Sequence, residues 1–135
     1  MNLQPYVFFY GRCEEALEFY KEAIGGSYNL QRVKDSGMDS SMPPDAGERV
    51  MHATFKGPGV TFMASDGQDV KAVDPDAGNI ALSLDCDDAA EGERVFQALS
   101  AGGSVMMPFD KSPWGDGKFG VCTDKFGIEW MMSTP

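Results

Sequence analysis

Apolar positions along this chain follow two spacings, a strand-like alternation and a helical period, and their order repeats. Segment 3–10 is aromatic and β-branched, which is typical of a strand. In segment 14–26 apolar residues recur at helical spacing after an acidic first turn, and a Gly-Gly pair ends the pattern. Three further strands are predicted over 28–34, 49–56 and 60–65, the last two joined by the turn 57-GPG-59.

The second half of the chain has the same order of elements. A strand is predicted over 79–85, a helix over 89–101, and three strands over 105–109, 118–123 and 128–133. The predicted helix ends also align, since 19-FYKEAIGGS-27 and 96-FQALSAGGS-104 share Phe, Gly, Gly and Ser. These matches indicate an internal duplication of a βαβββ unit.

The duplication predicts an α+β fold. One βαβββ unit leaves a sheet face that it cannot cover, whereas two can wrap into a curved, cup-like mixed sheet with the helices outside. We expect a single domain over residues 1–135, made of module one (1–66), a polar linker (67–77) and module two (78–135). Another polar segment, 35–48, is predicted to be a loop, either disordered or a lid over a site.

Charge and cysteine content exclude several classes of function. The formal net charge of −10 repels phosphate backbones and anionic lipids, so nucleic acid and membrane surfaces are not expected as partners. No apolar run approaches the roughly 20 residues of a membrane span, and no signal peptide pattern opens the sequence. Three cysteines without a CxxC pair argue against a disulfide framework and a zinc ribbon, and favour a cytoplasmic protein.

Four stretches carry a resemblance to a known superfamily: 5-PYVFFYGRCEEALEFYKEAIGG-26, 50-VMHATFKGPGVTFMASDG-67, 79-NIALSLDCDD-88 and 113-PWGDGKFGVCTDKFGIEWMMS-133. Together they resemble the vicinal oxygen chelate superfamily, which includes glyoxalase I, extradiol dioxygenases and bleomycin-resistance proteins. The match is strongest to its PhnB-like branch, also described as a 3-demethylubiquinone-9 3-methyltransferase-like domain. The resemblance implies a glyoxalase-like fold, a homodimer in which sheets of both chains complete the cups, and a small-molecule ligand.

Catalytic members of this superfamily hold a divalent metal through side chains that converge in the cup. In this chain the resemblance puts Pro5, Phe62, Asn79 and Met131 at the ligand positions. Pro, Phe and Met do not coordinate a hard divalent cation, and Asn is a weak ligand. We therefore expect no metal and no other cofactor. The chain also has no Rossmann-like unit that could hold a methyl donor.

Alternation from those four positions predicts a largely apolar pocket on the concave side of the sheet, because residues two apart in a strand share a face. Trp114, in a loop or hairpin, is expected either to meet a ligand or a second subunit, or to pack over the sheet edge. The predicted lining is Pro5, Val7, Phe9, Phe62, Asn79, Ala81, Ser83, Trp114 and Met131.

Three functions remain open from the sequence, and with them the question whether the chain is an enzyme. The first is metal-free binding of an unidentified small molecule in the concave pocket. The second is a glyoxalase- or dioxygenase-like lyase or isomerase, using unorthodox metal chemistry or acid/base chemistry by Glu129, Asp85 or His52, the only histidine. The third is a dimeric interaction module without a ligand.

Overall fold

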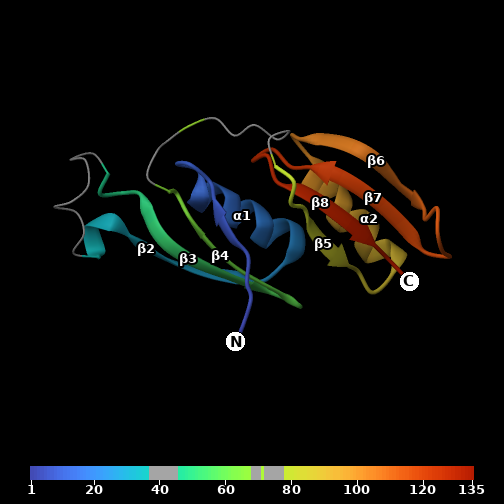
Figure 1. Cartoon of the computed structure of the whole chain (residues 1–135), viewed down its shortest axis with the longest axis horizontal. Helices are drawn as coiled ribbons and strands as arrows, with labels where there is room; N and C mark the ends of the chain where they lie inside the picture. Colours follow the sequence, from blue (N-terminus) through green and yellow to red (C-terminus); the bar gives the residue numbers. More distant parts are fainter. Residues whose placement is uncertain (37–45, 68–70, 72–77) are drawn as a thin grey trace. The chain divides into compact units, whose positions relative to one another are not determined.

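A computed structural model of the chain describes residues 1–36, 46–67, 71 and 78–135. These residues form two compact units, Met1–Ala72 and Val73–Pro135, each with a four-stranded sheet and one long helix (Figure 1). The predicted linker over 67–77 and the predicted loop over 35–48 lie largely outside the described residues. That the two units make one domain stays a prediction.

The first unit has the predicted order of elements. Its sheet, called the first sheet, runs β1-β4-β3-β2, with β1 parallel to β4 and the other neighbours antiparallel. The turn between β3 and β4 is the predicted GPG, where Gly59 has a φ of 69°. Its elements are β1 (Tyr6–Phe8), α1 (Cys13–Ile24), β2 (Ser27–Arg32), the 3-10 helix η1 (Val33–Asp35), β3 (Val50–Gly57) and β4 (Val60–Ser65).

The second unit repeats this topology. Its sheet, called the second sheet, runs β5-β8-β7-β6, with β5 parallel to β8. The α+β class and the two βαβββ modules predicted from the sequence are therefore confirmed. Its elements are β5 (Leu82–Asp85), α2 (Ala89–Ser100), β6 (Ser104–Lys111), β7 (Lys118–Thr123) and β8 (Glu129–Ser133).

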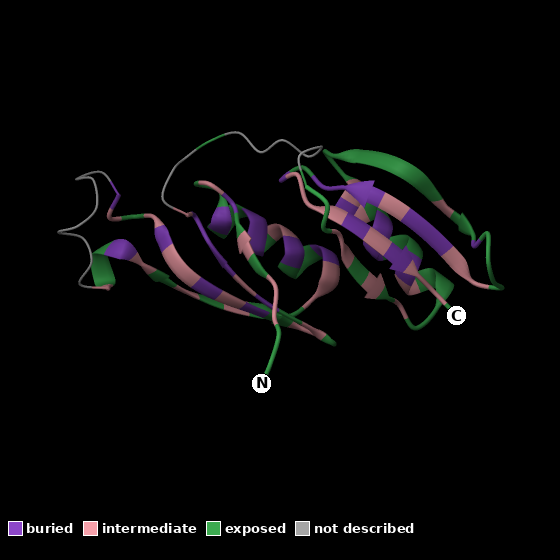
Figure 2. Ribbon diagram, in the orientation of Figure 1, coloured by how far each residue is buried: buried purple, intermediate pink, exposed green. Residues whose placement is uncertain are grey.

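Each helix covers one face of its own sheet, and buried residues line the contact between them (Figure 2). The buried residues of both helices are mostly apolar. On α1, the ring of Tyr20 lies 5.9 Å from that of Phe9 and 5.9 Å from that of Phe62, measured between centroids. Under α2, Phe96 stacks on Phe109 of β6 at 5.4 Å. Burial of such rings is the main stabilising contribution within each unit.

The glycines that match between the two halves have the same physical role. A Cβ on Gly26 would lie 2.3 Å from the carbonyl oxygen of Lys56, and one on Gly103 would lie 2.0 Å from that of Thr123. In both units the chain leaving the helix therefore passes directly against the backbone of the neighbouring strand. Any side chain at these positions would push the two segments apart.

The two helices begin in different ways. At α2 the cap is local, because Asp88 Oδ1 accepts a hydrogen bond from Glu91 N at 2.8 Å. At α1 the side chain of Arg12 makes no capping bond. Instead the buried Asp66, which follows β4, accepts from Cys13 N at 2.8 Å and from Val50 N at 2.7 Å. One carboxylate thus joins the start of α1, the start of β3 and the end of β4.

Candidate functional site

Aromatic side chains line the side of the first sheet that faces away from α1. Phe55 and Phe62 stack on the α1 side, so strand alternation turns their neighbours to the opposite side. Along β1 and the residues after it, this side carries Tyr6, Phe8 and Tyr10, with centroids 5.2 and 6.3 Å apart in succession. Tyr6 is 39% exposed and Phe8 50%. We call Tyr6, Phe8, Tyr10 and His52 the ring face.

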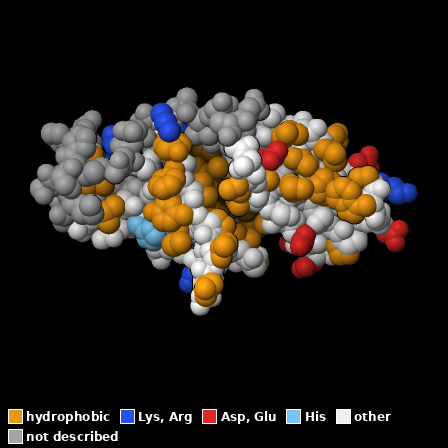
Figure 3. All heavy atoms as spheres, viewed as in Figure 1, with side chains coloured by type: hydrophobic (Ala, Val, Ile, Leu, Met, Phe, Trp, Pro, Cys, Tyr) orange, Lys and Arg blue, Asp and Glu red, His pale blue; other side chains and the backbone are white. Residues whose placement is uncertain are grey.

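Tyr6 reaches across β4 to His52 on β3. Its partner in β4 is Met63, which pairs in turn with Thr54, two residues after His52. The Tyr6 Oη lies 3.2 Å from His52 Nδ1, and the two ring centroids are 5.7 Å apart. Depending on the tautomer, the imidazole accepts the phenol proton or donates its own. Figure 3 shows hydrophobic side chains gathered beside this histidine.

Tyr10 stands at the other end of the row in a strained conformation. Its φ of 49° makes it the one non-glycine in the left-handed region among the described residues. That conformation costs an aromatic residue about 1–2 kcal/mol. The Nζ of Lys71 lies 4.4 Å from the centre of the Tyr10 ring, a cation–π contact. The ring face thus has an ammonium group at one end and the Tyr6–His52 pair at the other.

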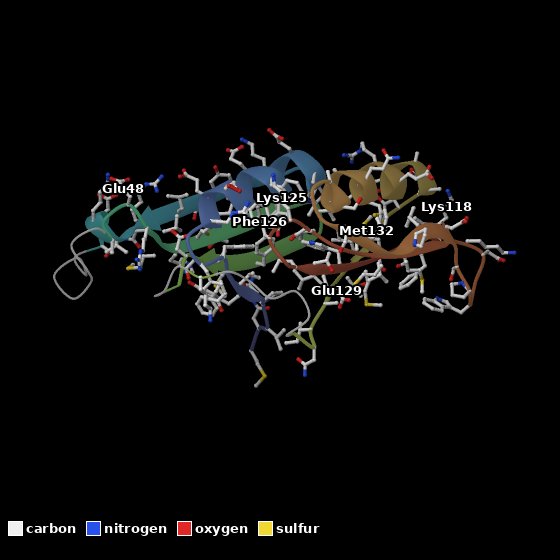
Figure 4. All side chains as sticks on the ribbon, turned by 90° about the horizontal axis from the view of Figure 1, so that it is seen from above. Glu48, Lys118, Lys125, Phe126, Glu129 and Met132 are labelled. Atoms are coloured by element: carbon white, nitrogen blue, oxygen red, sulfur yellow. The ribbon has the colours of Figure 1, made fainter. Side chains whose placement is uncertain are left out.

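The second sheet also has an uncovered face, with a different composition. Gly120 faces Phe96 of α2 and pairs with Met132, so Met132 is on the helix side of the sheet. Glu129 lies on the opposite side (Figure 4), and strand alternation puts Met131 there too. Trp114 is 70% exposed, and its ring lies 4.6 Å from that of Phe119.

Two hydrogen bonds made by Ser112 hold the Trp114 loop in place. Ser112 Oγ accepts from Trp114 N at 3.3 Å, and Ser112 N donates to Gly117 O at 2.8 Å. This agrees with the prediction of Trp114 in a loop between two strands. Whether it meets a ligand or a second subunit stays a prediction.

The lining predicted in the first unit was assigned to the wrong side of the sheet. Phe9 and Phe62 are 3% exposed and pack against Tyr20 of α1. Val7 pairs with the fully buried Ala64, and so shares that side. Pro5 is half-buried, and its carbonyl accepts from Met63 N at 2.9 Å. A shift of one residue in the assumed alternation exchanges the two faces, which explains the error.

Of the pocket residues predicted in the second unit, Ser83 and Met131 lie in strands, whereas Asn79 and Ala81 do not. Ser83 pairs with Met131, and both are on the side away from α2. Asn79 and Ala81 precede β5, which begins at Leu82 rather than at Asn79, and Asn79 is exposed. Asn79 therefore does not open the strand as predicted. That Ser83, Ala81 and Met131 line a pocket stays a prediction.

The three candidate acid/base groups do not form a cluster within either unit. Asp85 pairs with Ser133 and accepts its hydroxyl hydrogen bond at 2.6 Å, whereas Glu129 begins β8. Glu129 and Ser133 are four residues apart on one strand, about 13 Å. The two carboxylates therefore cannot act together on one bond within the unit. His52 lies in the other unit, and Tyr6 is its hydrogen-bond partner.

The cysteine thiols are poorly suited to nucleophilic chemistry. Burial, followed by the charges of Asp66 and Glu14, raises the pKa of Cys13 to about 12. Burial and then Asp124 raise the pKa of Cys122 to about 11. Burial, then the charge of Glu91, also raises the pKa of Cys86. Since the thiolate is the reactive form, all three are expected to be weak nucleophiles at neutral pH.

Metal-ligating side chains do not cluster in the described part of the chain, where no three His, Cys, Asp or Glu residues lie together. The one-residue shift turns Tyr6, Met63, Ser83 and Met131 away from the helices, and these four are no better than the predicted set for a hard divalent cation. His52 and Glu129 are suitable ligand types on the same sides, but they belong to different units. Binding without a metal stays a prediction.

Comparison with known proteins identifies the family. The sequence matches the family described as 3-demethylubiquinone-9 3-methyltransferase over residues 1–133. The chain belongs to this family. It is also 30% identical to protein YjdN of Escherichia coli K12, over 98% of this chain and 95% of that protein. The family name describes its members as a group, and the activity of this chain is a separate question.

Solved structures agree with this assignment. Protein PA1353 of Pseudomonas aeruginosa has a TM-score of 0.83 and 33% identity, covering 99% of this chain and 97% of that one. The PhnB protein of Bacillus cereus has a TM-score of 0.78 and 26% identity, with full coverage of both chains. A glyoxalase/bleomycin resistance/dioxygenase superfamily member from Sphaerobacter thermophilus shares the fold, with a TM-score of 0.58 at 18% identity. The predicted PhnB-like resemblance is therefore confirmed.

Sequence reasoning missed Tyr6, Phe8 and Tyr10 of the ring face, and Lys71, which contacts it at Tyr10. The stretch 6-YVFFY-10 is apolar or aromatic at every position, so alternation could not indicate which set faces outward. Lys71 lies within the segment predicted as a linker, and its contact with Tyr10 depends on the tertiary fold.

No helix among the described residues is long and apolar enough to cross a membrane.

Proposed function

We propose that the chain binds a small planar molecule on the ring face, without the help of a metal ion. The observation that carries this proposal is the succession of Tyr6, Phe8 and Tyr10, which present partly exposed rings along β1 and the two residues after it instead of burying them under α1. Covering such rings with a flat ligand is favourable by about 25 cal/mol per Å² of apolar area removed from water. Offset stacking adds a preference for aromatic ligands.

The strain at Tyr10 supports the same site. A glycine or asparagine would adopt a φ of 49° at lower cost, yet a tyrosine occupies the position. Backbone strain of this kind is concentrated at functional positions in proteins. A ring that is held in place at some cost in stability is consistent with a role in binding.

We further propose that a second copy of the chain completes the binding cup. The β6 strand is exposed along nearly its whole length (Figure 2), with Val105 50%, Met106 61% and Met107 43% exposed. Exposed apolar side chains grouped in this way mark interaction surfaces. A homodimer would cover them and supply the further sheet that the cup requires.

Ligand-induced stabilisation tests the proposed site. A ligand that binds only the folded protein raises its melting temperature, so a collection of planar ring compounds can be screened by thermal shift. Tyr10→Asn removes the ring but tolerates the backbone conformation, and should abolish the shift while leaving the unliganded protein folded. The matched control Ile80→Ser removes an exposed apolar side chain from the other unit, away from β6, and should retain the shift.

Two results would count against the proposal. If no planar compound stabilises the protein, the third function, an interaction module without a ligand, is favoured. If binding requires a stoichiometric divalent metal, shown by elemental analysis of the purified protein and loss of the shift with chelator, the metal-free site is wrong.

An acid/base enzyme is the second candidate, and the Tyr6–His52 hydrogen bond is the observation that favours it. A phenol and an imidazole in contact can pass a proton to or from a bound molecule. Turnover of any compound found in the screen, lost in His52→Gln while binding remains, would establish this candidate.

A further inference from the structure

We propose that the ligand of the ring face is an aromatic anion: a planar ring compound whose negative group meets Lys71 and whose ring hydroxyl meets the Tyr6–His52 pair. This inference rests on the proposed function and adds the chemical class of the ligand. The observation behind it is that the ring face has two different polar groups at its ends, the Lys71 ammonium group and the Tyr6–His52 pair.

Lys71 provides the positive end. Its Nζ is 4.4 Å from the centre of the Tyr10 ring, which places the ammonium group over the ring itself. Two other cations of the first unit are engaged by carboxylates, in the pairs Arg32–Glu14 and Lys34–Glu48. Within the described residues, Lys71 has no carboxylate in ion-pair contact. A cation on an aromatic surface, in a chain with a net charge of −10, selects for a ligand of opposite charge at that point.

The Tyr6–His52 pair provides a hydrogen-bonding end that suits a hydroxyl. If Tyr6 Oη donates its hydrogen bond to His52 Nδ1, the lone pairs of Oη remain available to accept a hydrogen bond from a ligand. If Nδ1 carries the proton, the Tyr6 hydroxyl is available to donate. A phenolic hydroxyl both donates and accepts, so it fits the pair in either state.

The aromatic row sets the size of the ligand. Three rings in succession, with centroid separations of 5.2 and 6.3 Å, extend beyond the area of a single benzene ring. A bicyclic ring with substituents at its two ends matches this length better than a monocyclic one. The suitable probe is therefore 6-hydroxy-2-naphthoate, with two analogues that each lack one polar group.

The experiment compares the probe with its neutral methyl ester and with 2-naphthoate, which lacks the hydroxyl, by isothermal titration of the full chain. Lys71→Gln should reduce the preference for the acid over the ester about 2- to 5-fold, the range for an exposed ion pair. Lys71→Arg keeps the charge and should keep the preference. Lys21→Gln makes the same charge change in the last turn of α1 and should leave the preference unaltered.

The hydroxyl is tested in the same way. Tyr6→Phe should reduce the preference for 6-hydroxy-2-naphthoate over 2-naphthoate about 2- to 10-fold, the value of one hydrogen bond, and leave the acid-to-ester ratio unchanged.

The possible failures can be told apart. If acid and ester both bind the wild type and Lys71→Gln does not alter their ratio, the anionic class is wrong and the proposed binding site stands. If none of the three compounds binds, but other planar compounds do so through Tyr10, the ligand class alone is overturned. If no planar compound of any charge binds, the proposed function itself fails.

Discussion

Asp66 connects three elements through a single buried side chain. Its two carboxylate oxygens accept backbone bonds from Cys13 and Val50, and its own N–H donates to Val50 O at 2.9 Å. Charge-assisted bonds of this kind are stronger than neutral ones. The acidic side chain also sits at the positive end of α1, where the helix dipole favours it. In the second unit the carboxylate of Asp124 also accepts several hydrogen bonds, from Phe126 N, Ile128 N and Trp130 Nε1.

Asp66→Asn is expected to lower the free energy of unfolding by about 2–3 kcal/mol. The asparagine has one acceptor oxygen, so its NH2 group would face one of the two backbone N–H donors and leave that donor unsatisfied. Urea denaturation followed by circular dichroism measures the loss. Asp116→Asn, an exposed position in a loop, is the matched control and should change stability by less than about 0.5 kcal/mol. An equal effect of both variants would contradict the role assigned to Asp66.

Thiol chemistry gives a second prediction for single residues. At pH 8 a disulfide reagent should modify one thiol per chain, Cys86, which is half-buried, whereas the buried Cys13 and Cys122 should react only after denaturation. Cys86→Ser should abolish the reaction of the native protein. Rapid modification of two or three thiols without denaturant would show that the interior is more open than the structure indicates.

The same thiols affect stability at alkaline pH. An unfolded cysteine ionises near its ordinary pKa of 9.0, whereas the folded Cys13 retains its proton until its pKa of about 12. The unfolded state therefore loses protons first, and stability should fall as the pH rises from about 9 to 12. Cys13→Ala should flatten this part of the stability curve.

At the scale of elements, the Gly-Gly-Ser match reflects close contact between backbones. Gly103→Ala would place a methyl group 2.0 Å from the carbonyl oxygen of Thr123 and should destabilise the protein by about 3 kcal/mol, the upper end for overpacking. Gly115→Ala has open space around its Cβ and should be nearly neutral. Thermal denaturation of both variants provides the comparison. Similar melting temperatures would mean that the strands can separate at little cost.

The sequence predicted the elements better than their faces. Periodicity identified both helices and the order of the strands, because a 12-residue amphipathic helix has a strong signal. In 129-EWMMS-133 the polar Glu129 next to the large Trp130 also indicated the correct side. In 6-YVFFY-10 no polar residue marks the outer side, so the ring face could not be assigned. Its end group, Lys71, comes from a distant part of the chain.

At the scale of the whole molecule, duplication leaves each unit with a sheet face that its own helix does not cover. We expect the protein to assemble as a dimer, with a mass in solution of twice the 14.6 kDa of one chain. Met106→Glu places a charge on the exposed β6 surface and should shift the assembly toward the monomer in sedimentation analysis.

The dimer prediction has its own control. Gln97→Glu adds the same charge on the exposed side of α2 and should leave the dimer intact. A wild-type protein that sediments at the mass of one chain at micromolar concentration would contradict the proposed assembly. A stable dimer of Met106→Glu would place the interface elsewhere.

The long-range cap of α1 has a consequence for synthesis. The bond from Cys13 to Asp66 joins residues 53 positions apart, whereas α2 carries its capping residue immediately before it. On the ribosome, at about 5–20 residues per second, roughly 3–10 s separate the emergence of the first helix from that of its carboxylate. During that interval the N–H of Cys13 at the start of α1 lacks its acceptor. The first unit therefore gains its helix cap only after its last strand, β4, and Asp66 have been synthesised. The unit made second has no such delay.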